Sequence, residues 1–195
     1  IVTPSLNQGR FLRQTIESVA AQTFRSFEHI VVDGGSTDDT VKILSEFPHI
    51  RWVSEREEHI VEAYAKGFAM ARGRYIIQCC VSDGFLDPNW FRKCIEVLEK
   101  DEEVSLVWGF GQAMSEEGEL LNVSFQDFFA DPPPQKQDFL AFWLVGGFPL
   151  PEGNYCVRSE VIRAWFPDTR SSGWFRTCPH LGFMYRFVTE GYSPY

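Results

Sequence analysis

Two aspartates, Asp33 and Asp83, stand where an apolar run of residues gives way to glycine. The apolar runs, residues 30–32 and 75–81, have the pattern of buried β-strands, so each aspartate is expected at the carboxyl end of a strand. Ligands bind at that edge of open α/β sheets, where a carboxylate can accept hydrogen bonds from hydroxyl or ring N–H groups of a nucleotide. The alternative for Asp33 is a local role as the cap of its glycine turn.

The segments around these turns alternate between strand and helix patterns. Apolar runs predict strands over residues 1–5, 28–32, 50–53, 75–81 and 104–110, and helical spacing predicts helices over residues 10–21, 36–47, 60–71 and 87–100. Ser36 and Asp39 form a capping-box-like start for the helix that Pro48 stops. This alternation predicts an α/β fold with a mostly parallel, Rossmann-like central sheet flanked by helices. Such a sheet would place Asp33 and Asp83 at one edge, which favours a nucleotide site.

The chain beyond residue 110 has a less regular pattern. We expect a hairpin turn at residues 116–119, a short helix at 137–144, a strand at 155–157, and helices at 159–165 and 181–189, with loops at 132–134 and 146–151.

Composition limits the class of protein. The 195 residues are 44% hydrophobic, which suits a globular α/β domain with a substantial core. A formal net charge of −9 argues against sequence-independent binding of nucleic acid. The five cysteines lack zinc-site spacing, and no stretch is long enough to span a bilayer, so a reducing, cytoplasmic compartment is expected. Because the sequence opens inside a predicted strand, we expect the chain to be trimmed, and its carboxyl end also looks cut short.

A series of motifs resembles the family 2 glycosyltransferases. The motifs lie at residues 2–9, 15–19, 22–24, 31–38, 52–55, 63–67 and 71–73, so the resemblance covers about the first 100 residues closely. It implies a GT-A fold and transfer of a sugar from a nucleotide-sugar, most often a UDP-sugar, usually with inversion. It also implies a single domain over residues 1–195, with a nucleotide-sugar-binding half over about 1–110 and an acceptor-side half over about 111–195. The expected acceptor is a saccharide or a lipid-linked molecule in polysaccharide or glycoconjugate synthesis, which would allow peripheral association with the inner face of a membrane.

The resemblance also assigns residues to the donor site. Thr3, Pro4 and Ser5 would line the base and ribose. Asp33 would hydrogen-bond the base, and Glu55 and Lys66 match positions near the donor pocket. The alternative for Lys66 is a solvated charge on its helix.

Ser82 and Asp83 match the acidic metal motif of the family, at the end of the central strand. A divalent cation, Mn²⁺ or Mg²⁺, held there by carboxylate oxygens would neutralise the pyrophosphate leaving group. This chain departs from the motif, because Gly84 replaces a second acidic residue that is often the direct ligand. Asp83 is therefore expected to hold a metal weakly through water or to contact the ribose.

Inverting transfer needs a base for the acceptor hydroxyl, and the family position that supplies it matches His180. A histidine can act as a base near neutral pH, but His180 could instead cap its helix or face solvent. Glu152 and Asp168 are further candidates without motif support.

Two other functions stay open. Gly84 and His180 are compatible with a catalytically degenerate module that binds a nucleotide-sugar on the same fold. A nucleotidyltransferase would need a basic, glycine-rich phosphate loop after the first strand, and residues 5–9 do not match one.

Overall fold

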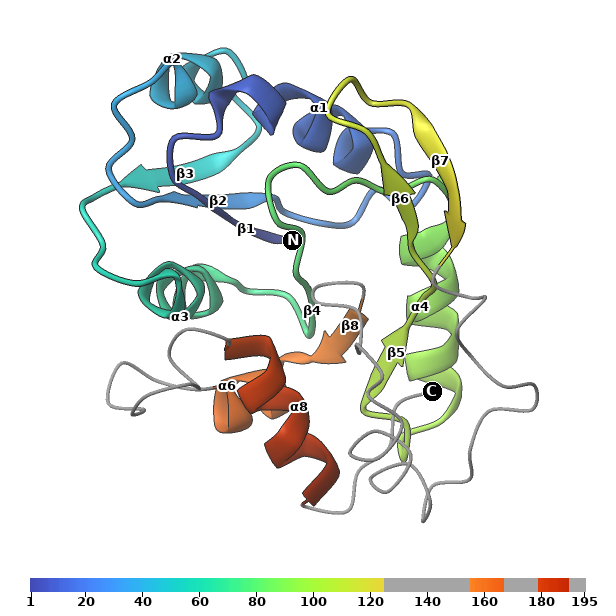
Figure 1. Ribbon diagram of the computed structural model, residues 1–195. Coiled ribbons are helices and arrows are strands. Elements are labelled where there is room, and N and C mark those ends of the chain that lie inside the picture. Colours follow the sequence, from blue (N-terminus) through green and yellow to red (C-terminus); the bar gives the residue numbers. More distant parts are fainter. Residues whose placement is uncertain (125–154, 167–178, 190–195) are drawn as a thin grey trace.

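The computed structural model describes residues 1–124, 155–166 and 179–189. Its first sheet contains three parallel strands, β1 (Val2–Ser5), β2 (Ile30–Asp33) and β3 (Arg51–Ser54), in the order β1-β2-β3 (Figure 1). Every residue of β1 and β2 is buried, in agreement with the β-branched residues Val2, Thr3 and 30–32, and each strand ends in a buried polar residue. The register aligns Ser5 with Asp33 and Asp33 with Ser54, so the strands end together at one edge.

Helices cover both faces of this first sheet. Figure 1 shows α1 (Gly9–Ala20) and α2 (Thr40–Ser45) on one face and α3 (Ile60–Met70) on the other. The alternation of side chains along β2 accounts for this arrangement, because Val31 packs with α1 and α2 whereas Ile30 and Val32 pack with α3. Helix α3 lies very close to β1, since a Cβ atom added at Gly67 would overlap the Val2 side chain.

A second sheet continues beside β1 with the order β4-β8-β5. Its strands are β4 (Tyr75–Ile77), β5 (Leu106–Trp108) and β8 (Tyr155–Arg158), and β8 runs antiparallel to both neighbours. A parallel bridge between Val2 and Gln78 joins the two sheets, so β4 runs in the same direction as β1. The mostly parallel sheet expected from the sequence thus contains one antiparallel strand, β8, which lies between β4 and β5.

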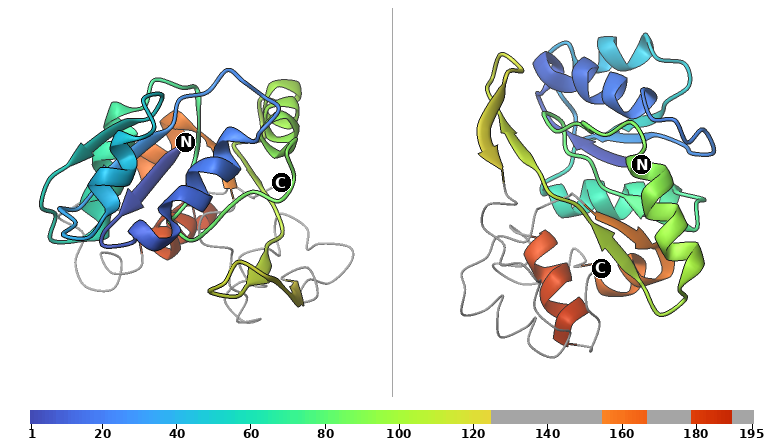
Figure 2. Two further views of the ribbon diagram at one scale, coloured as in Figure 1. Left: turned by 90° about the horizontal axis from the view of Figure 1, so that it is seen from above. Right: turned by 90° about the vertical axis from the view of Figure 1, so that its right-hand side faces the viewer.

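The second sheet also carries helices on both faces. Helix α4 (Trp90–Lys100) packs on the face formed by Ile77, Val107 and Cys156. Helices α6 (Ser159–Trp165) and α8 (Pro179–Thr189) pack on the opposite face, which also contacts α3 (Figure 2). The hairpin of β6 (Gln112–Met114) and β7 (Leu120–Ser124) confirms the turn expected at residues 116–119.

Some predicted boundaries were wrong. Helix α2 begins at Thr40 and not at Ser36, because the Ser36 hydroxyl is engaged with Asp33 and the Thr40 N–H donates to Asp38. Strand β4 ends at Ile77, and the chain turns where the Asp83 N–H donates to the Cys80 carbonyl at 3.1 Å. The predictions for residues 132–134, 137–144 and 146–151 lie outside the described residues. Among the helices that the structure describes, none has the length and apolar character needed to cross a membrane.

Candidate active site

The Asp33 carboxylate organises the turn that follows β2. Asp33 is fully buried, and its carboxylate accepts hydrogen bonds from the backbone N–H groups of Gly35 and Ser36 at 3.2 and 3.0 Å. It also accepts from the Ser36 hydroxyl and, at 2.6 Å, from the Ser54 hydroxyl on β3. Asp33 therefore caps its glycine turn, as the alternative from the sequence expected, and its carboxylate fixes the conformation of this turn beside β1.

A pocket of about 260 Å³ lies at the carboxyl ends of β1 and β2. Its lining comes from the end of β1, the turn after β2 and the start of α3, and consists of Pro4, Ser5, Leu6, Gln8, Gly34, Glu57, Glu58, His59, Ile60 and Ala63. Two of the predicted donor residues, Pro4 and Ser5, are in this lining. The Ser5 hydroxyl is buried and has no hydrogen-bond partner among the described residues.

Thr3 points away from this pocket. Its side chain is fully buried and shares a hydrogen bond of 3.0 Å with Nε2 of His29 in the protein interior. The alternation of side chains along a strand explains the placement, because the neighbouring residue Pro4 lines the pocket.

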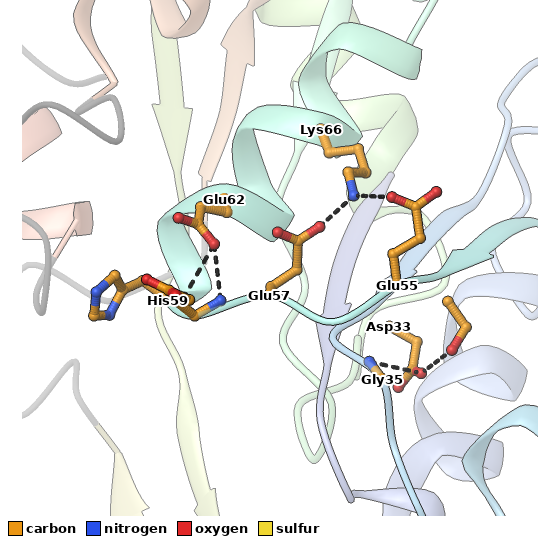
Figure 3. A network of polar contacts seen from close by, with 9 residues as sticks. Asp33, Gly35, Glu55, Glu57, His59, Glu62 and Lys66 are labelled. Carbon is orange, nitrogen blue, oxygen red and sulfur yellow. Dashed lines mark hydrogen bonds and ion pairs between the residues drawn. The ribbon is translucent and has the colours of Figure 1, made fainter.

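Lys66 and Glu55 meet in an ion-pair network at the wall of the pocket (Figure 3). The Lys66 ammonium, on α3, lies 2.7 Å from the Glu55 carboxylate and also contacts that of Glu57. These carboxylates raise the pKa of Lys66. The Glu57 side chain is only 13% exposed and lines the pocket, so Lys66 holds the pocket wall in place instead of extending into solvent.

The loop that carries Glu57 is fastened to the glycine turn. The Glu55 N–H donates to the Asp33 carbonyl at 3.0 Å, and the Glu57 N–H donates to the Gly34 carbonyl at 3.4 Å. Gly35 has a φ of +87°, and a Cβ atom there would lie 3.2 Å from the Arg56 backbone, which explains the second glycine.

The same loop ends in a capping box at the start of α3. There the Glu62 carboxylate accepts hydrogen bonds from the N–H groups of Glu58 and His59 (Figure 3). Sequence reasoning missed Glu57 and His59 as pocket residues, although the capping-box spacing from His59 to Glu62 could have located the start of α3.

Asp83 lies on a separate turn that packs against α1. The Thr15 hydroxyl of α1 donates to the Asp83 carbonyl at 2.8 Å and accepts from the Ser82 N–H at 3.2 Å. Ser82 has a φ of +81°, and both Ser82 and Asp83 are exposed. Because β4 runs parallel to β1, this turn and the Asp33 turn follow carboxyl ends of parallel strands and belong to the same edge.

Helix α1 contacts both acidic turns. At its start, the Gly9 N–H donates to the Asp38 carboxylate at 2.9 Å, and Asp38 belongs to the segment that follows Asp33. Further along, Thr15 holds the Asp83 turn. One rigid element therefore fixes the positions of the two turns, although the Asp33 carboxylate is buried and Asp83 is exposed.

The residues at the Asp83 turn fit a cation held jointly with a ligand. Within the described part of the chain, no cluster of three or more histidine, cysteine, aspartate or glutamate side chains could hold a metal by itself. A side chain at residue 84 would be crowded, since a Cβ atom there would lie 3.1 Å from the Ser18 hydroxyl. An exposed carboxylate suits Mg²⁺ or Mn²⁺, because such ions are often bound by one or two carboxylates together with substrate phosphates.

His180 lies inside the protein, near the start of α8. It is 6% exposed, its Nε2 is 3.0 Å from the Tyr64 hydroxyl, and its Nδ1 is 3.5 Å from the Tyr155 hydroxyl. Burial lowers the pKa of His180 to about 4, so the ring is neutral at pH 7. His180 is absent from the lining of the pocket. Glu152 and Asp168 lie outside the described residues.

The fold and this edge define a class of protein. A parallel sheet with a pocket at the ends of its first two strands, and a second acidic turn on the same edge, is typical of an α/β domain that binds nucleotides. The sequence model of glycosyl transferase family 2 matches residues 1–148, so the chain belongs to this family of glycosyltransferases.

Individual relatives support the same assignment. The chain is 32% identical over 176 residues to an uncharacterised glycosyltransferase of Mycobacterium tuberculosis, a match that covers 84% of this chain and 67% of that protein. It is also 32% identical over 126 residues to a chondroitin synthase of Escherichia coli, covering 63% of this chain but only 18% of the synthase. The chain thus spans less than a fifth of that synthase.

The fold is shared with solved glycosyltransferases. Glucosyl-3-phosphoglycerate synthase from Mycobacterium tuberculosis, solved with Mn²⁺, UDP and phosphoglyceric acid, superimposes with a TM-score of 0.65 at 18% identity. The superposition covers 99% of this chain and 65% of that one. The GT-A fold expected from the sequence is therefore confirmed.

Proposed function

We propose that this chain binds a UDP-sugar and transfers its sugar, with inversion, to an acceptor hydroxyl. The observation that carries the proposal is the pocket at the ends of β1 and β2, whose lining includes Pro4, Ser5 and the turn after β2. The M. tuberculosis synthase with the same fold was solved with UDP, which supports a uridine nucleotide as the ligand.

The charges around the pocket suggest how the donor lies. Glu57 and Glu58 line the pocket, and a negative wall favours a neutral base and ribose hydroxyls over phosphate groups. Pro4 and Ser5 would contact the base and ribose. Asp33 would contribute by fixing the conformation of the turn after β2, which lines the same pocket. Glu55 and Lys66 would keep the Glu57 wall in place.

The phosphates would then extend toward the turn of Ser82 and Asp83. A divalent cation bound there would supply positive charge to stabilise the departing diphosphate. This chain would contribute the Asp83 carboxylate as a ligand, with Thr15 and Ser82 fixing the backbone of the turn.

The proton of the acceptor hydroxyl needs a base. His180 as that base stays a prediction, and its burial between two tyrosines would require the acceptor to reach a ring that is 6% exposed. The identity of the acceptor, peripheral membrane association, the cytoplasmic location and the division of the chain near residue 110 also stay predictions. The names of the relatives, a synthase and a glycosyltransferase, do not favour the degenerate module.

The test is a panel of UDP-sugars and GDP-sugars, with release of the nucleoside diphosphate as the readout and Mn²⁺ or Mg²⁺ present. Donor hydrolysis or transfer should occur with a UDP-sugar and fall at least about 100-fold in Asp83→Asn. Because Asp83 is exposed, that variant should unfold at the same temperature as the wild type.

Asp87→Asn is the matched control. Asp87 lies on the same loop, but its carboxylate pairs with Lys93 at 2.7 Å, so its loss should leave turnover within about twofold. No binding of any nucleotide in the panel would overturn the proposal. Tight binding of UDP without turnover would instead support the degenerate module.

A further inference from the structure

A chain of polar groups, of which four are buried and one, Cys80, is half-buried, adjoins the Asp83 turn. The Tyr64 hydroxyl lies 3.0 Å from the Cys80 Sγ and 3.0 Å from Nε2 of His180. On the other side of the ring, Nδ1 of His180 lies 3.5 Å from the Tyr155 hydroxyl, which donates to Oε1 of Gln78 at 2.9 Å. We call these five residues the buried polar tract.

The tract joins elements that are far apart in the sequence. Tyr64 comes from α3, His180 from α8 and Tyr155 from β8, whereas Gln78 and Cys80 follow β4. Tyr64, Tyr155 and Gln78 are at most 2% exposed. Hydrogen bonds between groups buried to this degree are costly to break, because water cannot replace the lost partner.

Aromatic packing fixes the geometry of the tract. The rings of Tyr64 and His180 meet edge to face, with centroids 4.9 Å apart and planes at 87°. Phe166 packs against both rings, at centroid distances of 5.4 and 5.9 Å. The Tyr64 hydroxyl is thereby held at one position, where it contacts Cys80 and His180 together.

The tract reaches the proposed active site through the backbone. The Cys80 side chain contacts Tyr64, and its carbonyl accepts the hydrogen bond from the Asp83 N–H at 3.1 Å. On the other side of this turn, Thr15 of α1 binds the Asp83 carbonyl. The turn that presents Asp83 is therefore held by α1 on one side and by the tract on the other.

We propose that Tyr64 and His180 are positioning residues for Asp83. Their contacts connect α3 and α8 to Cys80 and so fix the conformation of the turn that would face the donor phosphates. The value of this geometry for donor binding rests on the proposed function. The tract gives His180 a role that needs no access to the acceptor, which agrees with its burial.

The experiment compares variants by two readouts. Amide hydrogen exchange of residues 79–86 reports the turn directly, and the KM for the UDP-sugar in the presence of Mn²⁺ reports its consequence. Tyr64→Phe removes one hydroxyl and keeps the ring packing, so exchange of the Asp83 amide should rise about fivefold and the donor KM should rise by a similar factor. The value of kcat should stay within about twofold.

Conservative variants separate the contacts from mere loss of packing. Cys80→Ala should reproduce Tyr64→Phe, Cys80→Ser should retain most of the wild-type behaviour, and the double variant Tyr64→Phe/Cys80→Ala should be no worse than either single one. Tyr75→Phe is the matched control, because the Tyr75 hydroxyl donates to Glu99 at 2.9 Å and lies outside the tract.

His180 is tested with two substitutions. Glutamine can place an amide near the position of Nε2 and keep the bond to Tyr64, so His180→Gln should retain most activity and an unchanged pH profile, whereas His180→Ala should behave like Tyr64→Phe. If both variants lose kcat equally and the pH profile loses a limb, His180 is the base and the proposal is overturned.

The two proposals fail in different ways. Unchanged hydrogen exchange in Tyr64→Phe, in a protein that still binds UDP, overturns the positioning role alone. Faster exchange of the Asp83 amide in a protein that binds no nucleotide supports the link between the tract and the turn and overturns the proposed function.

Discussion

Replacing Asp33 by alanine should destabilise the fold before any effect on substrate is considered. The carboxylate accepts hydrogen bonds from two backbone N–H groups and two hydroxyls, and it is fully buried. In Asp33→Ala the exposed Gly35 N–H can turn to water, but the half-buried hydroxyls of Ser36 and Ser54 lose their acceptor.

The magnitude follows from these partners. An unsatisfied buried donor costs about 1–3 kcal/mol, and loss of bonds to a charged group costs a similar amount, so we expect a destabilisation of about 3 kcal/mol. For a chain of this size, each kcal/mol lowers Tm by about 2–4 °C, which predicts a decrease of about 6–12 °C. Loss of activity in this variant would therefore not by itself identify Asp33 as a ligand of the base.

Thermal unfolding followed by circular dichroism measures the effect, with and without UDP. Ser54→Ala is the matched comparison, because it removes one of the four donors and should lower Tm by about 2–4 °C. A Tm of Asp33→Ala within about 1 °C of the wild type would refute the account of the turn.

Three further predictions concern other contacts. Gly67→Ala should destabilise the protein by about 1–3 kcal/mol in urea unfolding, because the new methyl group overlaps Val2; equal or higher stability would contradict the close packing of α3 on β1. Lys66→Met leaves the charges of Glu55 and Glu57 uncompensated, so it should weaken UDP binding in calorimetry more at low salt than at high salt, while Tm changes by less than about 2 °C. An affinity that does not depend on salt would argue against a role of Lys66 in neutralising the pocket wall. Stability should fall as the pH is lowered from 6.5 toward 4, because His180 has a folded pKa of about 4 and the unfolded chain binds the proton first. Buried His29, with a folded pKa of about 3, adds a loss over the same range, so His180→Gln should reduce the total loss by about 3 kcal/mol without abolishing it; an unchanged loss in that variant would reject the assignment.

The edge of the first sheet could be predicted because it depends on local patterns. Each of β1, β2 and β3 contains apolar or β-branched residues between turn signals, and parallel strands joined by helices must end at the same edge. The meeting of Ser5, Asp33 and the Asp83 turn at that edge follows from this rule alone. The position of β8 could not be predicted, since its pairing joins residues 75 and 158, which no local pattern connects.

The environment of single side chains was harder to predict. Lys66 has the same sequence context whether it faces solvent or an ion pair, and the loop that carries Glu57 decides the outcome. His180 was identified correctly near the start of a helix, but its burial depends on Tyr64, a residue 116 positions away. The environments of Thr3 and Pro4, by contrast, could have been predicted. Neighbouring side chains on a strand point to opposite faces, so only one of the two can line the pocket, and that residue is Pro4.

A crystal structure of the protein with UDP and Mn²⁺ would show how the donor lies. We expect the uracil and ribose against Pro4, Ser5 and Gly34, with the diphosphate extending toward Asp83. UDP bound at the opposite edge of the sheet, or with its phosphates against Glu57 and Glu58, would contradict this expectation.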